Sequence, residues 1–408
     1  MKALIISAAF PPLRTGGADF IHRLASELAV RGVEVTVIAS EGAVSHDDKI
    51  RLERVSNKWN WQTVQKCASM VRKIKPDVVD IVFTGWMYHD HPGITFLPVM
   101  IKQSFQSARV VVHIESLGGI RRDKSNFARA ASRFVASLVS GRNGISYEYG
   151  TLLRDSDAII TLSERDRDEL IKRDADVQRK SITISPPPIM PVVAPLSKNE
   201  RHAGRRKLGL KDDGDLLLSF YGYVYPGKGL ESLFEVVKRF HQQGRNVKLM
   251  IVGDIPEQYV LEREGKPDYL ADLKKLARDL GINERIIWCE YAAYGSTEPS
   301  TKLRLSDICV FPFDSGINQH NSSFWFAAAH GLPIVATKSA TTEDIFVDKQ
   351  NVIFAEAANV SDLTSKIDHL SKDNALRERL GAESENLANT RFSWDSALDR
   401  TLAVFSGV

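Results

Sequence analysis

Cysteine is scarce in this chain of 408 residues. The three cysteines, Cys67, Cys289 and Cys309, lie far apart in the sequence and have none of the paired spacings of metal-binding cysteines. So few and so scattered cysteines are typical of a protein that works in a reducing compartment.

Long apolar runs and an excess of charge of one sign are also missing. No uninterrupted apolar run approaches the roughly 20 residues that span a bilayer. The apolar start, residues 1–7, is too short for a signal peptide and predicts a first strand. Lys and Arg number 54 against 51 Asp and Glu, and a net charge of +3 gives no reason to expect nucleic acid as a partner. We therefore expect a cytoplasmic protein.

Length and composition indicate a folded protein of two domains. Apolar residues make up 43% and charged residues 26% of the sequence. One hydrophobic core rarely organises a chain this long. The consecutive prolines Pro186, Pro187 and Pro188 can continue neither a helix nor an interior strand, so the domain boundary is expected there. The predicted parts are an N-terminal domain (1–188), a C-terminal domain (189–390) and a C-terminal helix (391–408) that could pack back on the N-terminal domain.

Short apolar runs alternate with segments of helical periodicity through both halves. This alternation predicts βαβ units, which form parallel sheets with helices on both faces. The predicted fold is α/β, with two doubly wound Rossmann-like domains facing each other across a cleft. We expect residues 157–163 to be the last strand of the first domain. Strands are predicted at 3–7, 33–38, 76–83, 109–114, 157–163, 216–221, 247–252, 286–288 and 332–336.

Two features of the first half are candidates for ligand binding. Gly16 and Gly17 precede a helix and let the backbone come close to a ligand, for which a phosphate is the best match. The dinucleotide pattern G-x-G-x-x-G is missing after the first strand, so NAD(P) is not indicated. His113 ends a predicted strand, where ligands of doubly wound sheets bind. A hydrogen-bonded structural histidine is the competing interpretation.

The second half has two further candidates. Lys228 stands in a glycine-rich turn before a helix, where its charge would add to the helix dipole. Farther on, a polar loop containing Asn318 leads to Asn321, Ser322 and Ser323, which are good helix N-cap residues. A helix start of this kind can bind an anion, although an ordinary βαβ connection explains this stretch as well.

A basic amphipathic segment covers residues 121–142. Its apolar residues recur at helical spacing, and arginines and a lysine surround them. Such a helix can lie on an anionic membrane surface, or it can be an ordinary surface helix packed on the sheet. The first alternative would make the protein peripheral on the inner face of the membrane.

Taken in order, these features resemble the two-domain (GT-B fold) retaining glycosyltransferases of group 1, also called family 4. The resemblance covers nearly the whole chain. It rests on Phe10-Pro11-Pro12 with Gly16-Gly17, the strand that ends in His113, Asp157 with Leu162-Ser163-Glu164, Pro226-Gly227-Lys228-Gly229, Ala329-His330-Gly331-Leu332-Pro333, and Phe392-Ser393-Trp394.

The resemblance implies transfer of a sugar from a nucleotide diphosphate sugar to an acceptor with retention of configuration. Gly17 then corresponds to the glycine near the donor's diphosphate. Lys228 corresponds to the basic residue that neutralises the leaving diphosphate, and His113 to the histidine near the reacting sugar. The donor would also meet Gly16, Asn318, Asn321, Ser322 and Ser323. No cofactor and no bound metal is expected, and the acceptor would be a polysaccharide or glycolipid.

The sequence departs from the family pattern at three positions. The family commonly has two glutamates eight residues apart in the donor loop, and Asn318 and Phe326 stand at the matching positions here. It also commonly has an arginine near the start of the lysine turn, where this chain has Tyr223. We therefore predict a divergent donor site. UDP-glucose is the first choice of donor; a non-catalytic nucleotide-sugar-binding protein and a nucleotide-sugar epimerase of the same fold are the alternatives.

Membrane attachment through residues 121–142 can be tested directly. If this segment lies on a membrane, the protein sediments with vesicles that contain anionic lipid at low salt, because the basic side chains are attracted to the lipid charge. Neutral vesicles are the control. No binding to anionic vesicles at low salt would rule out this attachment.

Overall fold

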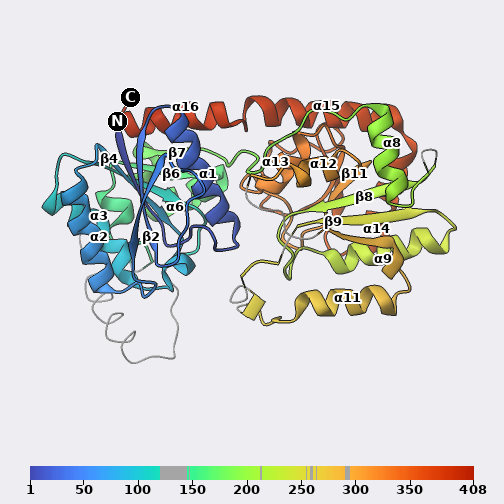
Figure 1. The fold of residues 1–408 in the computed structure, drawn as a ribbon, viewed down its shortest axis with the longest axis horizontal. Coiled ribbons are helices and arrows are strands. Elements are labelled where there is room, and N and C mark those ends of the chain that lie inside the picture. Colours follow the sequence, from blue (N-terminus) through green and yellow to red (C-terminus); the bar gives the residue numbers. More distant parts are fainter. Residues whose placement is uncertain are drawn as a thin grey trace. The chain divides into compact units, whose positions relative to one another are not determined.

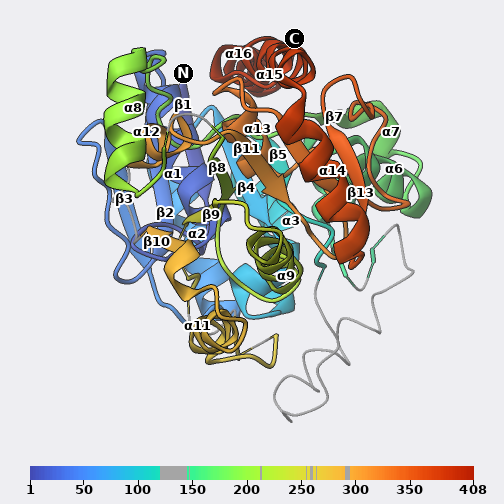
Figure 2. The same ribbon diagram turned by 90° about the vertical axis from the view of Figure 1, so that its right-hand side faces the viewer.

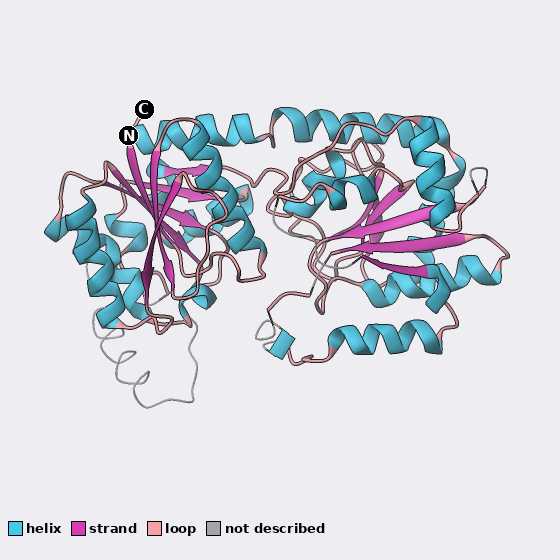
Figure 3. Cartoon of the chain, viewed as in Figure 1, coloured by secondary structure: helices cyan, strands magenta, loops and turns pink. Residues whose placement is uncertain are grey.

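The chain folds into two compact units. The computed structural model describes residues 1–119, 145–146, 148–211, 214–253, 255–257, 261–262, 264–289 and 295–408. The first unit consists of Met1–Ser185 with Ala397–Val408, and the second of Pro186–Ser396 (Figure 1). In each unit a parallel sheet has helices on both faces (Figure 3). The basic amphipathic segment, residues 121–142, lies outside the described residues.

The first unit contains a seven-stranded sheet of order β3-β2-β1-β4-β5-β6-β7, in which every neighbouring pair is parallel. The strands are β1 (Lys2–Ile6), β2 (Glu34–Ser40), β3 (Ile50–Val55), β4 (Val78–Phe83), β5 (Arg109–Ile114), β6 (Ala158–Thr161) and β7 (Ser181–Thr183). The connecting helices are α1 (Gly16–Val30), α2 (Trp61–Ile74), η1 (Gly85–Tyr88), η2 (Pro92–Phe96), α3 (Leu97–Ser104), α5 (Leu152–Asp155), α6 (Glu164–Arg173) and α7 (Val177–Lys180). The central strands are almost continuously apolar because helices cover both faces of the sheet.

The second unit contains a six-stranded parallel sheet of order β10-β9-β8-β11-β12-β13. Its strands are β8 (Leu216–Tyr221), β9 (Val247–Val252), β10 (Ile286–Cys289), β11 (Ile308–Phe311), β12 (Ile334–Lys338) and β13 (Ile353–Glu356). Helices α9 (Leu230–Gln242), α11 (Tyr269–Asp279) and α14 (Val360–Lys372) pack together on one face (Figures 1 and 2). The other described helices of this unit are α8 (Lys198–Lys207), η3 (Asn283–Arg285), α12 (Glu298–Leu303), α13 (Ser322–Ala328) and α15 (Asn374–Thr390).

The last helix, α16 (Trp394–Ser406), returns the chain to the first unit. There Asp399 pairs with Arg31 at 2.9 Å, and the carbonyl of Val404 accepts a hydrogen bond of 2.8 Å from Arg109 Nε. At its start, Trp394 Nε1 donates to the carbonyl of Pro188 at 2.7 Å. Among the described residues, no helix has the length and apolar character to cross a membrane.

The predicted α/β class with two doubly wound domains is confirmed, but individual elements differ from the prediction. The segment 157–163 is not the last strand of its sheet, because the three-residue strand β7 follows it. So short a strand has no detectable period. Strand β3 lies at the edge of the sheet. Its two end residues, Ile50 and Val55, are buried, whereas Arg51 and Arg54 between them are exposed. Helices α8 and α15 are largely polar, and the sequence interpretation missed them.

The strand order reverses at one point in each sheet. In the first sheet the chain moves outward from β1 through β2 to β3 and then starts again on the other side of β1 with β4. The second sheet does the same at β8 and β11. Ligands of such folds bind beyond the carboxyl ends of the strands at these switch points. The loops after β1 and β4, and after β8 and β11, are therefore where binding residues are expected.

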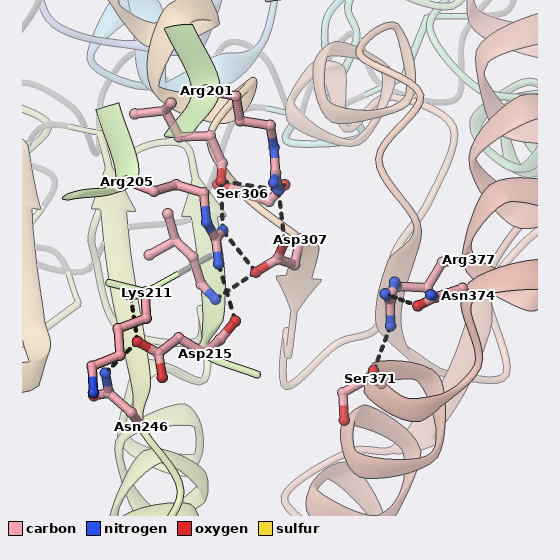
Figure 4. A network of polar contacts seen from close by, with 12 residues as sticks. Arg201, Arg205, Lys211, Asp215, Asn246, Ser306, Asp307, Ser371, Asn374 and Arg377 are labelled. Atoms are coloured by element: carbon pink, nitrogen blue, oxygen red, sulfur yellow. Dashed lines mark hydrogen bonds and ion pairs between the residues drawn. The ribbon is translucent and has the colours of Figure 1, made fainter. Parts of the chain in front are cut away.

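The opposite, amino-terminal edge of the second sheet is held by a buried ion-pair network (Figure 4). Arg205 is 1% exposed and binds Asp307 Oδ2 at 2.9 Å. The same carboxylate binds Arg201 at 2.6 Å and accepts the Leu217 amide at 2.8 Å. The neighbouring Asp215 carboxylate accepts from the Asn246 side chain at 2.7 Å. The charges at this edge pair with one another, and the edge lies away from the switch point.

His330 makes a second buried network at the end of α13. Its Nδ1 lies 2.6 Å from the Phe326 carbonyl, which can only accept, so Nδ1 carries the hydrogen. Nε2 then accepts from the Ser300 hydroxyl at 2.6 Å, and that hydroxyl accepts from the Val193 amide at 2.8 Å. Burial lowers the pKa of His330 from 6.5 to about 4, against a smaller opposing effect of the hydrogen bond to Phe326.

We expect Asp307→Asn to lower the free energy of unfolding by about 3 kcal/mol, because the buried Arg205 would lose its counter-ion. Urea denaturation followed by circular dichroism measures this change. Asp368→Asn is the control: it breaks a partly exposed pair with Arg245 and should cost less than ~1 kcal/mol. Equal losses in the two variants would contradict the assignment.

We expect the stability advantage of wild type over His330→Gln to shrink by about 3 kcal/mol between pH 7 and pH 4. The pKa of His330 is lower in the folded than in the unfolded state. The unfolded chain therefore binds more protons in this range, and the stability decreases as the pH is lowered from 7 to 4. His22, whose pKa burial also lowers to about 4, is present in both proteins and cancels in the difference. Unfolding curves at several pH values test this; a constant difference would refute it.

Candidate functional site

Lys228 lies in the loop between β8 and α9, at the switch point of the second sheet. Its Nζ is 4.1 Å from the centroid of the Phe313 ring and 4.6 Å from that of Tyr225. No carboxylate comes within ion-pair distance of Lys228 among the described residues. The two rings hold the ammonium group by cation–π attraction without neutralising it. Lys228 is therefore a positive charge without a counter-ion among the described residues.

The loop after β11 packs directly on the lysine loop. The Asp314 amide donates to the Gly227 carbonyl at 3.0 Å. A Cβ on Gly229 would fall 1.8 Å from the carbonyl oxygen of Pro312, and Gly229 has φ +68°. Only glycine fits there, so the Pro226-Gly227-Lys228-Gly229 turn needs its last glycine for a close backbone contact. This contact fixes Lys228 relative to Phe313.

Two carboxylates, Glu231 and Asp314, adjoin the lysine loop. Glu231, in the first turn of α9, accepts a hydrogen bond of 2.9 Å from the Tyr269 hydroxyl. Desolvation raises the pKa of Asp314, and the charge of Glu231 raises it further. The sequence interpretation did not single out Glu231 or Tyr269, because neither lies in the predicted loops. No cluster of three or more potential metal ligands occurs among the residues that the structure describes.

Small residues meet at the carboxyl ends of β8 and β9. A Cβ on Gly253 would fall 1.9 Å from the carbonyl oxygen of Gly222, and one on Gly222 would lie 3.5 Å from Ser323 Cβ. Gly222 has φ +130°, which L-residues rarely adopt. Two strand exits and the start of α13 thus meet without large side chains between them, so backbone groups can approach a ligand here.

The start of α13 offers fewer free donors than the sequence suggested. The helix has seven residues. The side-chain oxygen of its N-cap residue, Asn321, accepts a hydrogen bond of 2.9 Å from the backbone amide of Asn318 and none from the amides of the helix. The Ser322 amide donates to the His320 carbonyl at 2.9 Å. Within the described part of the chain, the Ser323 amide has no acceptor and the buried Asn318 Oδ1 has no donor. At this helix start, Asn318 Oδ1 and the Ser323 amide are therefore the groups without partners within the described chain.

Phe326, at the position of the second family glutamate, belongs to the hydrophobic core. It is 0% exposed, and its ring lies 4.5 Å from the Tyr221 ring and 4.7 Å from the His330 ring. A glutamate could not ionise in this environment without a large desolvation cost. At this position the chain thus has a packed core side chain, and Tyr221, at the end of β8, is its partner.

Gly17 lies in the first turn of α1, at the switch point of the first sheet. Gly16 starts the same helix, and Thr15 caps it through a hydrogen bond of 3.2 Å from the Ala18 amide. A Cβ on Gly17 would meet Met87 Cε at 2.6 Å and Glu115 Oε1 at 3.3 Å. The glutamate carboxylate therefore lies beside the helix start, where the dipole favours negative charge and where the sequence predicts a phosphate.

His113 lies at the carboxyl-terminal end of β5 and is 1% exposed. Its Nδ1 is 3.7 Å from Oδ2 of Asp80, which is 0% exposed in the middle of β4. Phe20 of α1 lies edge-on to the imidazole, with ring centroids 5.5 Å apart. The sequence interpretation missed Asp80, although a single charge inside the apolar run Val78–Phe83 is a signal that could have identified it.

The predicted residues fall into two groups, one in each unit. Gly16, Gly17 and His113 lie at the carboxyl edge of the first sheet, and Lys228, Asn318, Asn321, Ser322 and Ser323 at that of the second. The two groups come from equivalent places in two sheets of the same design. Comparison with known proteins shows which family uses this arrangement.

Two family models match the chain. One, described as glycosyl transferases group 1, matches residues 201–387; the other, described as glycosyltransferase family 4, matches residues 14–191. Among curated proteins, the lipopolysaccharide core biosynthesis glycosyltransferase LpsE of Rhizobium meliloti is 24% identical over 50% of this chain and 53% of its own length. A GDP-mannose-dependent phosphatidylinositol monomannoside mannosyltransferase of Mycolicibacterium smegmatis is 21% identical, over 45% and 46%. The chain spans about half the length of the curated relatives it matches.

Solved structures match over the whole chain. A glycosyltransferase from Rickettsia africae has a TM-score of 0.73 at 15% identity, covering 100% of this chain and 98% of that one. Anabaena HepE in complex with UDP has a TM-score of 0.71 at 15% identity, covering 100% of both chains. Identities this low demonstrate a shared fold and nothing finer. One family model matches each half of the chain, and the strand order reverses once in each of its two parallel sheets. The chain therefore belongs to the group 1 glycosyltransferases of the two-domain GT-B fold.

Proposed function

We propose that the protein transfers a sugar from a nucleotide diphosphate sugar to a polysaccharide or glycolipid acceptor, with retention of configuration. One observation carries this proposal: Lys228 is a positive charge held between Tyr225 and Phe313 with no carboxylate in ion-pair distance within the described chain. A site built in this way favours an anionic ligand, and a diphosphate matches the family to which the chain belongs.

The chemistry explains why such a charge accelerates transfer. Breaking the bond between sugar and diphosphate develops negative charge on the leaving oxygen. Fixed donors and charges directed at that oxygen stabilise the transition state and need no reorganisation during the reaction. In this proposal Lys228 supplies the charge, with backbone groups near Gly222 and the Ser323 amide as further donors. No bound metal is then required for charge neutralisation.

The remaining predicted residues have separate roles in the proposal. Asn318 recognises the donor through its unpaired Oδ1, together with Asn321 and Ser322 in the same loop. In the first unit, Gly16 and Gly17 approach the diphosphate, and Glu115 must move away from Gly17 before they can do so. His113 contacts the reacting sugar. UDP-glucose is the first donor to test.

The buried Phe326 favours one alternative, a protein that binds nucleotide sugars without transferring them. A ring in the core cannot make the polar contacts of a glutamate. Assays of donor hydrolysis and transfer over a panel of donors and acceptors separate the two functions. Binding of UDP without turnover of any donor would favour the alternative, whereas a new sugar nucleotide formed without acceptor would indicate an epimerase.

We expect Lys228→Ala to lower the turnover number by a factor of several hundred, because one lost electrostatic donor costs about 2.7–4 kcal/mol in the transition state. The melting temperature should stay within a few degrees of wild type, since the side chain is only partly buried. Release of UDP from UDP-sugars measures turnover.

Lys238→Ala is the matched control. Lys238 lies farther along α9, where it pairs with Glu235 at 3.3 Å, and its loss should leave turnover unchanged. Full activity in Lys228→Ala, or an equal loss in both variants, would contradict the role of Lys228 as the stabilising charge.

A further inference from the structure

The donor loop, residues 314–321, holds the main chain of Asn318 firmly. The Asn318 amide donates to Asn321 Oδ1 at 2.9 Å, and the Asn318 carbonyl accepts from the Asn321 amide at 3.1 Å. One residue farther on, the carbonyl of the buried Gln319 accepts from Trp325 Nε1 at 2.9 Å. The main chain of Asn318 is therefore fully hydrogen-bonded, whereas its side-chain Oδ1 has no partner within the described chain.

A second loop, residues 339–347 after β12, binds both chain neighbours of Asn318. Glu343 Oε2 accepts the Gln319 amide at 3.0 Å, and the Thr342 hydroxyl donates to the Ile317 carbonyl at 2.8 Å. Both side chains are half-buried. A carboxylate and a hydroxyl from one loop thus fix the peptide groups on the two sides of a residue in another loop.

The two loops are also joined at a point that does not involve Glu343. A Cβ on Gly316 would fall 2.7 Å from the Ser339 amide nitrogen, and Gly316 has φ +72°. The Ile317 amide donates to the Thr337 carbonyl at 3.1 Å. Because β11 and β12 are parallel neighbours, the loops that follow them leave the same edge of the sheet. Removal of Glu343 would therefore loosen the segment around Gln319 and leave the start of the loop in place.

Loss of the carboxylate would have a definite consequence for Asn318. The Gln319 amide belongs to a residue that is only 3% exposed, and a buried amide without an acceptor is costly. The segment would shift until the amide reached water or another acceptor. Asn318, which shares the peptide bond with Gln319, would move with it.

We propose that Glu343 is the positioning residue of Asn318: its carboxylate holds the Gln319 amide and thereby fixes the Asn318 carboxamide in the orientation that binds the donor. The inference rests on the proposed function, in which Asn318 recognises the donor. Glu343 acts through the loop and does not contact the donor. A recognition group that is held in place before binding loses little freedom on binding, which improves affinity.

Amide hydrogen exchange, followed by nuclear magnetic resonance on protein labelled with 15N, tests the loop contact without any ligand. We expect the Gln319 amide to exchange slowly in wild type and in Glu343→Gln, whose side-chain carbonyl can still accept. In Glu343→Ala it should exchange roughly tenfold faster or more. The Ile317 amide is the internal control and should keep its rate. An unchanged Gln319 rate in Glu343→Ala, or equal acceleration at Ile317, would overturn the proposal.

Donor binding tests the consequence for recognition. The probe is the nucleotide sugar that wild type binds most tightly in calorimetric titrations with UDP-, GDP-, ADP- and dTDP-sugars. We expect Glu343→Ala to weaken its binding about tenfold, which corresponds to one lost hydrogen bond, and Glu343→Gln to stay within about twofold of wild type. Asp344→Ala, which removes the exposed neighbouring carboxylate, is the matched control and should bind like wild type. Wild-type affinity in Glu343→Ala would overturn the proposal.

A double-mutant cycle separates positioning from a merely structural role. Asn318→Ala alone should weaken donor binding, and Glu343→Ala should have no further effect in that background. In transfer assays Glu343→Ala should raise the KM for the donor with kcat nearly unchanged, unlike Lys228→Ala, which lowers kcat. A structural role predicts losses that multiply in the double variant, and this result would overturn the proposal.

These measurements also distinguish the inference from the proposed function. If a donor binds in a manner that depends on Glu343 but none is turned over, only the transferase activity is refuted. If transfer proceeds and Glu343→Ala has wild-type KM, only the role of Glu343 is refuted. If wild type binds no nucleotide sugar, both are refuted.

Discussion

Parallel pairing of every strand in both sheets is the constraint on which the rest of the structure depends. Parallel strands place all their carboxyl ends at one edge, and the reversal of strand order separates two neighbouring loops at that edge. Lys228 and Phe313 meet because β8 and β11 are neighbours at such a reversal. Gly17 and Met87 meet because β1 and β4 are neighbours at the other. The polar chemistry of the chain therefore gathers at two equivalent places.

The two edges of the second sheet have opposite characters. At the amino edge, Arg205 and Asp307 form a network in which charges are paired and main-chain groups are hydrogen-bonded. At the carboxyl edge, Lys228 has aromatic faces but no counter-ion within the described chain, and Asn318 Oδ1 is buried without a partner. The paired charges stabilise the amino edge, while in the proposed function the groups of the carboxyl edge that have no partner among the described residues are available for a ligand. The Asp80–His113 pair in the first unit is unsatisfied in the same way.

Phe326 of helix α13 is a core side chain at the position where the family resemblance led us to expect a glutamate. Phe326 fills a core position against Tyr221 and His330, so this part of the loop contributes packing where the family commonly has a carboxylate. Nearby, Gly222, Gly253 and Ser323 keep the strand exits free of large side chains. In the proposed function, recognition of the donor therefore depends on backbone groups and on Asn318 more than on side-chain carboxylates.

Much of this could be predicted from the sequence. Buried strands such as β4, β5, β8 and β9 have a local apolar pattern, and glycine-rich turns before helices identify the loops that hold Gly17 and Lys228. The three-residue strand β7, the charged edge strand β3 and the polar helix α15 were missed because their stability comes from packing and not from a local period.

The sequence by itself determined the buried strands and the glycine-rich turns, and with them the positions of Lys228, His113 and the glycines along the chain, because these depend on local periodicity and turn chemistry. Only the tertiary structure decided which side chains meet. The pairing of β4 with β5 brings Asp80 to His113, and the packing of two loops puts Lys228 between Tyr225 and Phe313. Such contacts join residues that are separated in the chain, and burial then sets their energies by removing water.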